Sequence, residues 1–133
     1  MKRFGLIVLL LAVCLAGCSK SNTVPTLGNV SDFTKVDLCI GDQYNISLTL
    51  QDPGAIQSLV STVNTFLASA SVYTITADDL ASVTQFYYLE FFVGSIRSEV
   101  IMTNAYLRFN GHYYRNEAYS SFYTSVLALY PEQ

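Results

Sequence analysis

Alternation of apolar and polar residues predicts a β-hairpin in the first half of the chain. Residues 35–40 and 44–50 have the composition of strands, and apolar residues occupy every second position of the second one. A three-residue loop, 41–43, would pair Leu38 with Ile46. Because successive side chains of a strand point to opposite faces, this register keeps the apolar residues of both strands together, whereas a two-residue turn would not.

Helical spacing replaces this alternation after Asp52-Pro53. The Asp52 carboxylate can accept hydrogen bonds from free N–H groups at a helix start, and Pro53 suits the first helical position, where its missing N–H costs nothing. A helix is therefore predicted to about Ser69, with an uncharged polar side. Its apolar stripe consists of Ile56, Leu59, Val60, Val63 and Leu67. Residues 72–76 then predict a short strand, and 76–82 a loop or a single helical turn.

The strand predicted over 85–93 is followed by a turn whose length decides the register. A tight two-residue turn would set Glu90 opposite Glu99, and like charges at directly opposed positions destabilise a sheet. A four-residue loop, 94–97, would instead pair Glu90 with Ile101. We therefore expect the longer loop.

The Asn-Gly pair at 110–111 predicts a second hairpin with a defined register. A type I′ turn needs positive φ at both central residues, and Asn and Gly tolerate this conformation best. Phe109 would then face His112 on one side of the sheet, and Arg108 would face Tyr113 on the other.

Aromatic and aliphatic residues recur at helical spacing over 117–130 and predict a terminal helix. The order of elements is therefore two strands, a helix, a short strand, four strands and a helix. This order predicts an α+β fold, with an antiparallel β-sheet and the helices packed on one face.

The N-terminus has the features of a bacterial export signal. Lys2 and Arg3 give a short positive segment, residues 4–15 are apolar, and small residues follow. The apolar run of 12 residues is shorter than the roughly 20 that cross a bilayer, which disfavours a transmembrane anchor. The segment Leu15-Ala16-Gly17-Cys18 resembles the lipobox of bacterial lipoproteins.

This resemblance implies how the chain is processed and where it resides. A signal peptide, here 1–17, would be removed, and the new N-terminal Cys18 would carry a thioether-linked diacylglyceryl group. The protein would then be extracytoplasmic and lipid-anchored to the cell membrane, or to the outer membrane if the source has one. Residues 18–33 are rich in turn formers and are expected to form a flexible tether, followed by a single domain over 34–133. The order of elements also resembles small bacterial lipoproteins whose domain has no assigned activity.

Charge and cysteine content narrow the possible partners. Without 1–17, five basic and ten acidic residues leave a net charge of −5, which argues against nucleic acid as a partner. Besides the lipidated cysteine, only Cys39 would remain. No histidine or pair of basic residues lies near Cys39 in sequence to lower its pKa, so we expect it to fill a strand position as a small apolar residue.

Catalytic and metal-binding chemistry has little support in the sequence. His112 is the only histidine, and the hairpin register aims it at the apolar face, where a packing role is expected. Asp37, Asp42, Asp78 and Asp79 lack the spacing of a calcium loop, and we expect them to cap helices or face solvent. No metal site or cofactor motif is predicted.

One group of side chains could form a binding surface. The second hairpin would place Tyr106 opposite Arg115, beside the pair Arg108 and Tyr113, on the sheet face away from the helices. Aromatic and arginine side chains together suit contact with a protein or with sugar rings. Alternatively, these pairs only stabilise an exposed sheet. The candidate surface, expected to be mostly exposed, consists of Tyr88, Phe92, Tyr106, Arg108, Tyr113 and Arg115.

These features together predict a lipid-anchored, non-enzymatic cell-envelope protein that serves as an interaction or binding module. One alternative is a glycan- or peptide-binding module that acts through the Tyr–Arg face of the sheet. The other is a small hydrolase that uses His112. The expected partners are the membrane, through the lipid anchor, and an envelope protein or glycan.

Overall fold

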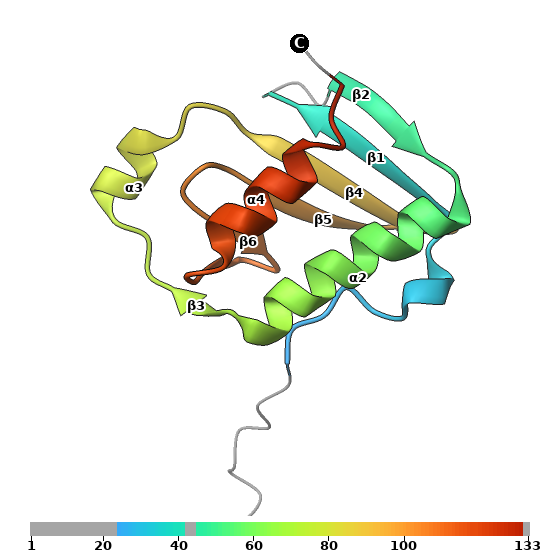
Figure 1. The fold of residues 1–133 in the computed structure, drawn as a ribbon, viewed down its shortest axis with the longest axis horizontal. Helices are drawn as coiled ribbons and strands as arrows, with labels where there is room; N and C mark the ends of the chain where they lie inside the picture. The colour runs from blue at the N-terminus through green and yellow to red at the C-terminus, as the bar shows by residue number, and fades with distance from the viewer. Residues whose placement is uncertain (1–23, 42–44, 132–133) are drawn as a thin grey trace, which may run out of the picture.

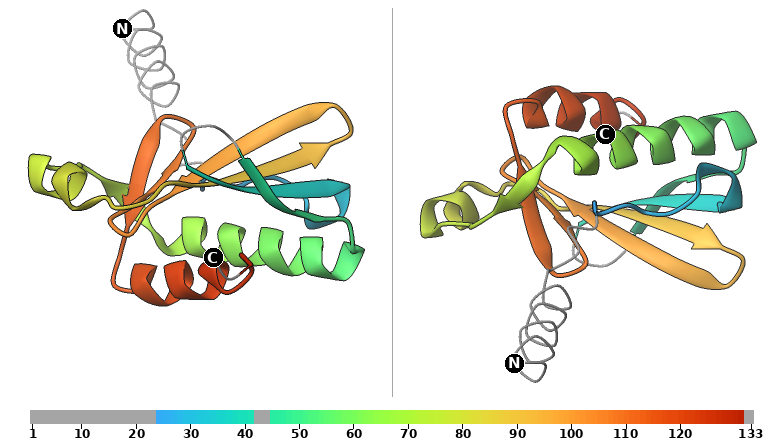
Figure 2. Two further views of the ribbon diagram at one scale, coloured as in Figure 1. Left: turned by 90° about the horizontal axis from the view of Figure 1, so that it is seen from above. Right: turned by 90° about the horizontal axis from the view of Figure 1, so that it is seen from below.

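Two helices cover one face of an antiparallel sheet in the computed structural model, which describes residues 24–41 and 45–131. The predicted signal peptide and lipobox lie outside the described residues. Among the described strands the order in the sheet is β2-β1-β4-β5-β6-β7-β3, with every neighbouring pair antiparallel. Helices α2 and α4 lie together over one face, and α3 stands apart beyond the sheet (Figure 1, Figure 2). The predicted α+β class is therefore confirmed.

The elements follow the predicted order along the chain. The strands are β1 (Lys35–Ile40), β2 (Asn45–Leu50), β3 (Ser71–Tyr73), β4 (Tyr87–Val93), β5 (Ile96–Met102), β6 (Leu107–Phe109) and β7 (His112–Arg115). The helices are a short 3-10 turn, η1 (Val30–Asp32), and α2 (Pro53–Ser69), α3 (Ala77–Ser82) and α4 (Tyr119–Leu127). Figure 2 shows that the β6–β7 hairpin crosses the direction of the β4–β5 hairpin, so the sheet is strongly twisted.

Helix α2 begins and ends where the sequence predicts. An Asp52 carboxylate oxygen accepts a hydrogen bond from the backbone N–H of Ala55 at 2.8 Å, and Pro53 is the first helical residue. All five residues of the predicted apolar stripe are buried, and Phe66 is buried beside them. The ring of Phe66 stacks on Phe122 of α4 with centroids 4.5 Å apart, which joins the two helices.

The register predicted for the first hairpin is wrong. Leu38 lies opposite Leu48 instead of Ile46, and the register shifts between Leu38 and Cys39, which lies opposite Ile46. An irregularity of this kind interrupts the strict alternation on which the prediction depended. Ile46 consequently remains 59% exposed. Residues 42–44, which belong to the predicted loop, lie outside the described residues.

The four-residue loop predicted after β4 is also wrong. Val93 pairs with Ile96, so the turn has two residues, and Glu90 lies opposite Glu99. The repulsion is offset because Arg97 contacts the Glu90 carboxylate at 3.0 Å. Gly94 has φ of 60°, a conformation that glycine adopts readily and that suits a tight hairpin turn.

The Asn-Gly hairpin has the predicted register. Asn110 and Gly111 have φ of 48° and 77°, Phe109 pairs with His112, and Arg108 pairs with Tyr113. Beyond these pairs the prediction fails, because β6 begins at Leu107 and Tyr106 lies before it, so Arg115 pairs only with Ser71 of β3 on the other edge of β7.

The segment expected to be a flexible tether packs against the domain in its second half. Leu27 and Phe33 are buried in the core. The Asn64 side chain of α2 accepts a hydrogen bond from the Leu27 N–H at 2.8 Å and donates one to the Gly28 carbonyl at 3.1 Å. Two buried side chains and a bidentate amide thus fix this segment on α2.

Candidate functional site

The sheet face away from α2 and α4, called the open face below, carries one register-matched row of aromatic, aliphatic and basic side chains. The row crosses β4, β5, β6, β7 and β3 and consists of Tyr88, Ile101, Arg108, Tyr113 and Tyr73. The Arg108 guanidinium lies 5.7 Å from the centre of the Tyr113 ring, within cation–π range. Three of the predicted surface residues, Tyr88, Arg108 and Tyr113, therefore lie in one row.

Tyr106 does not contribute to an exposed surface as expected, because only 4% of it is accessible. It precedes β6, and its carbonyl accepts a hydrogen bond from the Thr103 N–H at 2.9 Å. Its ring meets the Tyr113 ring edge-on with centroids 5.0 Å apart. The buried ring of Tyr106 thus packs against the ring of Tyr113 and supports its position.

Phe92 lies in a second row between two basic residues. It pairs with Lys35 on one side and with Arg97 on the other. The Lys35 ammonium lies 4.2 Å from the centre of the Phe92 ring. This predicted surface residue therefore belongs to a charged part of the open face.

Between these rows, three carboxylates lie in register across adjacent strands. Asp37 pairs with Glu90, and Glu90 pairs with Glu99. Asp37 accepts a hydrogen bond from the Thr49 hydroxyl at 2.7 Å and lies 3.0 Å from Lys35. This row was not predicted, because the expected register paired Glu90 with Ile101.

The acidic cluster considered from the sequence does not form among the described residues. Asp79 caps α3, Asp37 lies on β1, and Asp42 is outside the described residues. No group of three or more His, Cys, Asp or Glu side chains in the described part of the chain could hold a metal ion.

Cys39 is fully buried opposite Tyr88. Burial raises the pKa of its thiol to about 11, and the nearby carboxylates, Glu90 first, act in the same direction. A thiol in this environment stays protonated at neutral pH and has little nucleophilic character.

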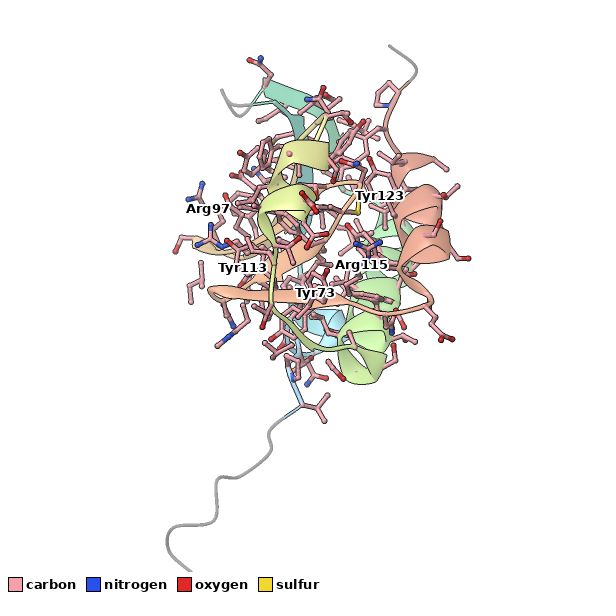
Figure 3. The ribbon with its side chains drawn as sticks, turned by 90° about the vertical axis from the view of Figure 1, so that its left-hand side faces the viewer. Tyr73, Arg97, Tyr113, Arg115 and Tyr123 are labelled. Carbon is pink, nitrogen blue, oxygen red and sulfur yellow. The ribbon has the colours of Figure 1, made fainter. Side chains whose placement is uncertain are left out.

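A concave site lies where β3, β7 and the start of α4 meet. We call it the tyrosine–arginine hollow; it has a volume of about 560 Å³. Figure 3 shows Arg115 and Tyr123 between α3 and α4, apart from Tyr113 and Arg97. The hollow is lined by Tyr73, Asn104, Arg115, Asn116, Glu117, Tyr119, Ser120 and Tyr123.

Asp79 fixes one wall of the hollow. Its carboxylate accepts hydrogen bonds from the Tyr73 hydroxyl at 2.9 Å and the Thr76 N–H at 2.8 Å, and it lies 3.4 Å from Arg115. These contacts, led by the Thr76 N–H, hold the pKa of Asp79 below its usual value. The hydrogen bond to Asp79 raises the pKa of Tyr73. Arg115 also lies over the Tyr73 ring, 5.9 Å from its centre, so both side chains are held in place.

The opposite wall comes from α4 and the chain before it. The Tyr119 hydroxyl hydrogen-bonds to the Tyr106 carbonyl at 2.7 Å and contacts the Thr103 carbonyl. Tyr123, one helical turn later, is half-buried, and burial raises the pKa of its hydroxyl. Asn104, between β5 and β6, also lines the hollow and holds the end of α3 by donating a hydrogen bond to the Ser82 carbonyl at 2.8 Å.

The charges around the hollow nearly cancel. Asp79 and Arg115 form an ion pair, and Glu117 adds one exposed carboxylate at the rim. Asn116 has its amide engaged, since it donates to the Ser69 hydroxyl and accepts from the Ala118 N–H. Arg115, Tyr123 and Glu117 retain polar groups for a ligand, because a guanidinium carries five N–H donors and a carboxylate about four acceptor sites.

Only Arg115 of this hollow belonged to the predicted surface. Tyr73 and Asp79 were missed as site residues, although the sequence holds a local signal for their arrangement. Thr76 and Asp79 form a capping box at the start of α3, a pattern of a hydroxyl residue followed three positions later by an acidic one.

Two other hollows lack this combination of groups. The groove between α2 and α4, about 580 Å³, is lined by Ser and Thr hydroxyls, by Ala118 and by Phe66 and Phe122, without a charged residue. His112, expected to pack under the helices, is exposed beside a hollow of about 440 Å³. The other residues around it are Pro25, Ala70, Val72, Asn110 and Tyr114. Among them, the phenol of Tyr114 is the only hydroxyl or thiol group.

Comparisons with known proteins do not assign the chain to a family. No family model, curated protein or solved structure matches the chain. Within the described residues, no helix is both long and apolar enough to cross a membrane.

Proposed function

We propose that the protein is a lipid-anchored, non-enzymatic component of the cell envelope whose domain binds a ligand in the tyrosine–arginine hollow. The anchor is inferred from the lipobox at Leu15-Ala16-Gly17-Cys18. The binding role is supported by one observation above the others. Tyr73 and Arg115 are held in fixed positions by a shared carboxylate at the edge of a hollow whose size suits a small molecule.

The chemistry of the lining favours a neutral saccharide. The C–H faces of a sugar ring can pack on tyrosine rings, and its hydroxyls can both donate and accept hydrogen bonds. Arg115 supplies donors, Glu117 supplies acceptors, and the Tyr123 hydroxyl can do either. An anionic ligand is disfavoured because Asp79 already pairs with Arg115 and Glu117 adds a negative charge.

The anchor is tested by Cys18→Ser. The thioether forms only on sulfur, so this substitution should abolish labelling by a fatty-acid analogue and prevent normal signal cleavage. Two acyl chains hold a protein on a membrane where one binds only marginally, so the variant should also leave its usual membrane fraction. Unchanged labelling of the Cys18→Ser protein would exclude the lipid anchor.

The ligand class is tested by titrating the protein with cellobiose and N-acetylglucosamine oligomers, and with a disaccharide that contains a uronic acid. The neutral sugars should bind more tightly than the acidic one. Arg115→Gln should weaken that binding about 10- to 100-fold, because hydrogen bonds to a charged group contribute about 1.5 to 3 kcal/mol.

Arg108→Gln is the matched control, since Arg108 is an exposed arginine beside a tyrosine on the open face. It should leave the affinity unchanged. If Arg108→Gln weakens sugar binding and Arg115→Gln does not, the site is the open face of the sheet. If none of the sugars binds while an extended peptide does, the saccharide assignment is wrong.

A further inference from the structure

Exposed apolar side chains lie where the described chain begins, beside the edge strand β3. Val24, the first residue that the structure describes, is 58% exposed, and Val72 of β3 is 63% exposed. Pro25 and Val72 line the hollow of about 440 Å³ at this edge together with His112. Figure 1 shows this start of the chain below β3 and the end of α2. We call Val24, Pro25, Val72 and His112 the tether patch.

The distance in sequence between the lipobox cysteine and the domain indicates what lies opposite this patch. Val24 follows Cys18 by six residues, and six residues span at most about 22 Å when fully extended. A lipid on Cys18 therefore keeps the tether patch within this distance of the bilayer. A small domain is about 30 Å across, so the opposite edge of the sheet has no such constraint.

The chemistry of the patch suits a lipid surface. Val24 and Val72 offer apolar side chains for the boundary between headgroups and acyl chains, and His112 offers a polar group for the headgroups. None of the residues that line this hollow is acidic, although acidic residues outnumber basic ones in the chain after residue 17. Lys20, the one charged residue between the lipobox and the patch, is basic and suits anionic lipids.

We propose that the tether patch contacts the membrane surface and orients the domain on it. This inference rests on the lipid anchor of the proposed function. Val72 pairs with buried Tyr114, whereas the next residue, Tyr73, pairs with Tyr113 on the open face. Adjacent side chains of a strand point to opposite faces, so membrane contact through Val72 leaves Tyr73 free to take part in the tyrosine–arginine hollow.

The test attaches a fluorophore to single cysteines of the full-length lipidated protein in vesicles of phosphatidylcholine and phosphatidylglycerol. Cys18 would carry the lipid and Cys39 is buried, so a maleimide dye should react only with an introduced cysteine. Lipids with a nitroxide headgroup should quench the dye at Val72→Cys at least about twofold more than at Ile46→Cys, because apolar groups at an interface lie at the headgroup boundary. Ile46 is the matched control, since it is 59% exposed on β2, at the opposite edge of the sheet.

A charged substitution checks the contact without moving the dye. In the protein labelled at Val72→Cys, Val24→Asp should reduce the quenching, because a carboxylate is costly to desolvate and is repelled by anionic lipids. Ile46→Asp introduces the same charge at the far edge and should leave the quenching unchanged.

Flotation of the vesicles distinguishes this inference from the anchor itself. Protein that does not float with the vesicles would refute the lipid anchor, and the membrane contact with it. Protein that floats but shows equal quenching at Val72→Cys and Ile46→Cys would overturn the membrane contact alone. Quenching that is insensitive to Val24→Asp in floating protein would do the same.

Discussion

Two tyrosines one helical turn apart on α4 have different roles. Tyr119 is buried, and its hydroxyl contacts the carbonyls of Tyr106 and Thr103. Tyr123 is half-buried and has no hydrogen bond to another described residue. The first hydroxyl therefore satisfies buried backbone groups, whereas the second is available at the hollow.

Tyr119→Phe should destabilise the protein by about 1 to 3 kcal/mol, because a buried carbonyl loses its donor. Tyr123→Phe removes a hydroxyl from the same helix and should change stability by less than about 0.5 kcal/mol. Denaturant unfolding of both variants measures the difference. Equal losses would show that the Tyr119 hydrogen bonds do not stabilise the fold.

Cys39 should be unreactive in the folded protein. Its pKa is about 11 in the folded state, against an ordinary value of 9.0, so iodoacetamide at pH 8 should modify it only after denaturation. A raised folded pKa also gives a stability contribution that is full below pH 9 and is lost as the pH rises toward about 11. Rapid alkylation of the native protein at pH 8 would contradict the buried placement.

At the scale of elements, short-range signals predicted the structure well. Asp52-Pro53 starts α2, and the Asn-Gly pair at 110–111 sets the β6–β7 register. Each signal depends on groups that are only a few residues apart, so the local sequence is sufficient to predict the structure that it forms.

Registers that depend on the rest of the fold were not predictable in this way. The tight turn after β4 sets Glu90 opposite Glu99, and the local charge rule disfavours that pairing. The rule is overridden because Arg97 contacts Glu90, and because β4 is also paired with β1 on its other side. Arg97 belongs to the hairpin itself, but the pairing of β4 with β1 is not visible in the sequence of the hairpin alone.

The compensating role of Arg97 can be measured. Arg97→Ala should destabilise the protein by about 0.5 to 1 kcal/mol, since Arg97 is half exposed and its ion pair is partly screened. In a Glu99→Gln background the same substitution should cost less, because the opposed carboxylate is gone. An Arg97→Ala loss that is unchanged by Glu99→Gln would show that Arg97 does not offset this repulsion.

At the scale of the whole molecule, the fold class and helix-facing core were predictable, but the hollow was not. Tyr73, Asn104, Arg115 and Tyr123 come from four separate segments. They meet because β3 returns to pair with β7, and because Asp79 and Ser82 of α3 contact Arg115 and Asn104. Such long-range pairing leaves no periodic signal in the sequence.

The core between the sheet and the helices is tested by Leu59→Ala on α2 and Leu89→Ala on β4, both buried. Each should destabilise the protein by about 2 to 5 kcal/mol, through lost burial and the cavity left behind. Leu80→Ala is the matched control, because Leu80 on α3 is 53% exposed. Losses at Leu59 and Leu89 no larger than at Leu80 would show that the buried face is assigned incorrectly.

The central claim is that the tyrosine–arginine hollow binds the ligand, and mapping that ligand on the molecule tests it most directly. Two-dimensional NMR of the isotope-labelled protein, titrated with N-acetylglucosamine oligomers, should show saturable shifts at Tyr73, Arg115 and Tyr123. Signals of Arg108 and of the groove between α2 and α4 should stay unchanged. Shifts centred on Arg108 or on that groove, or no saturable shift at the hollow, would contradict the claim.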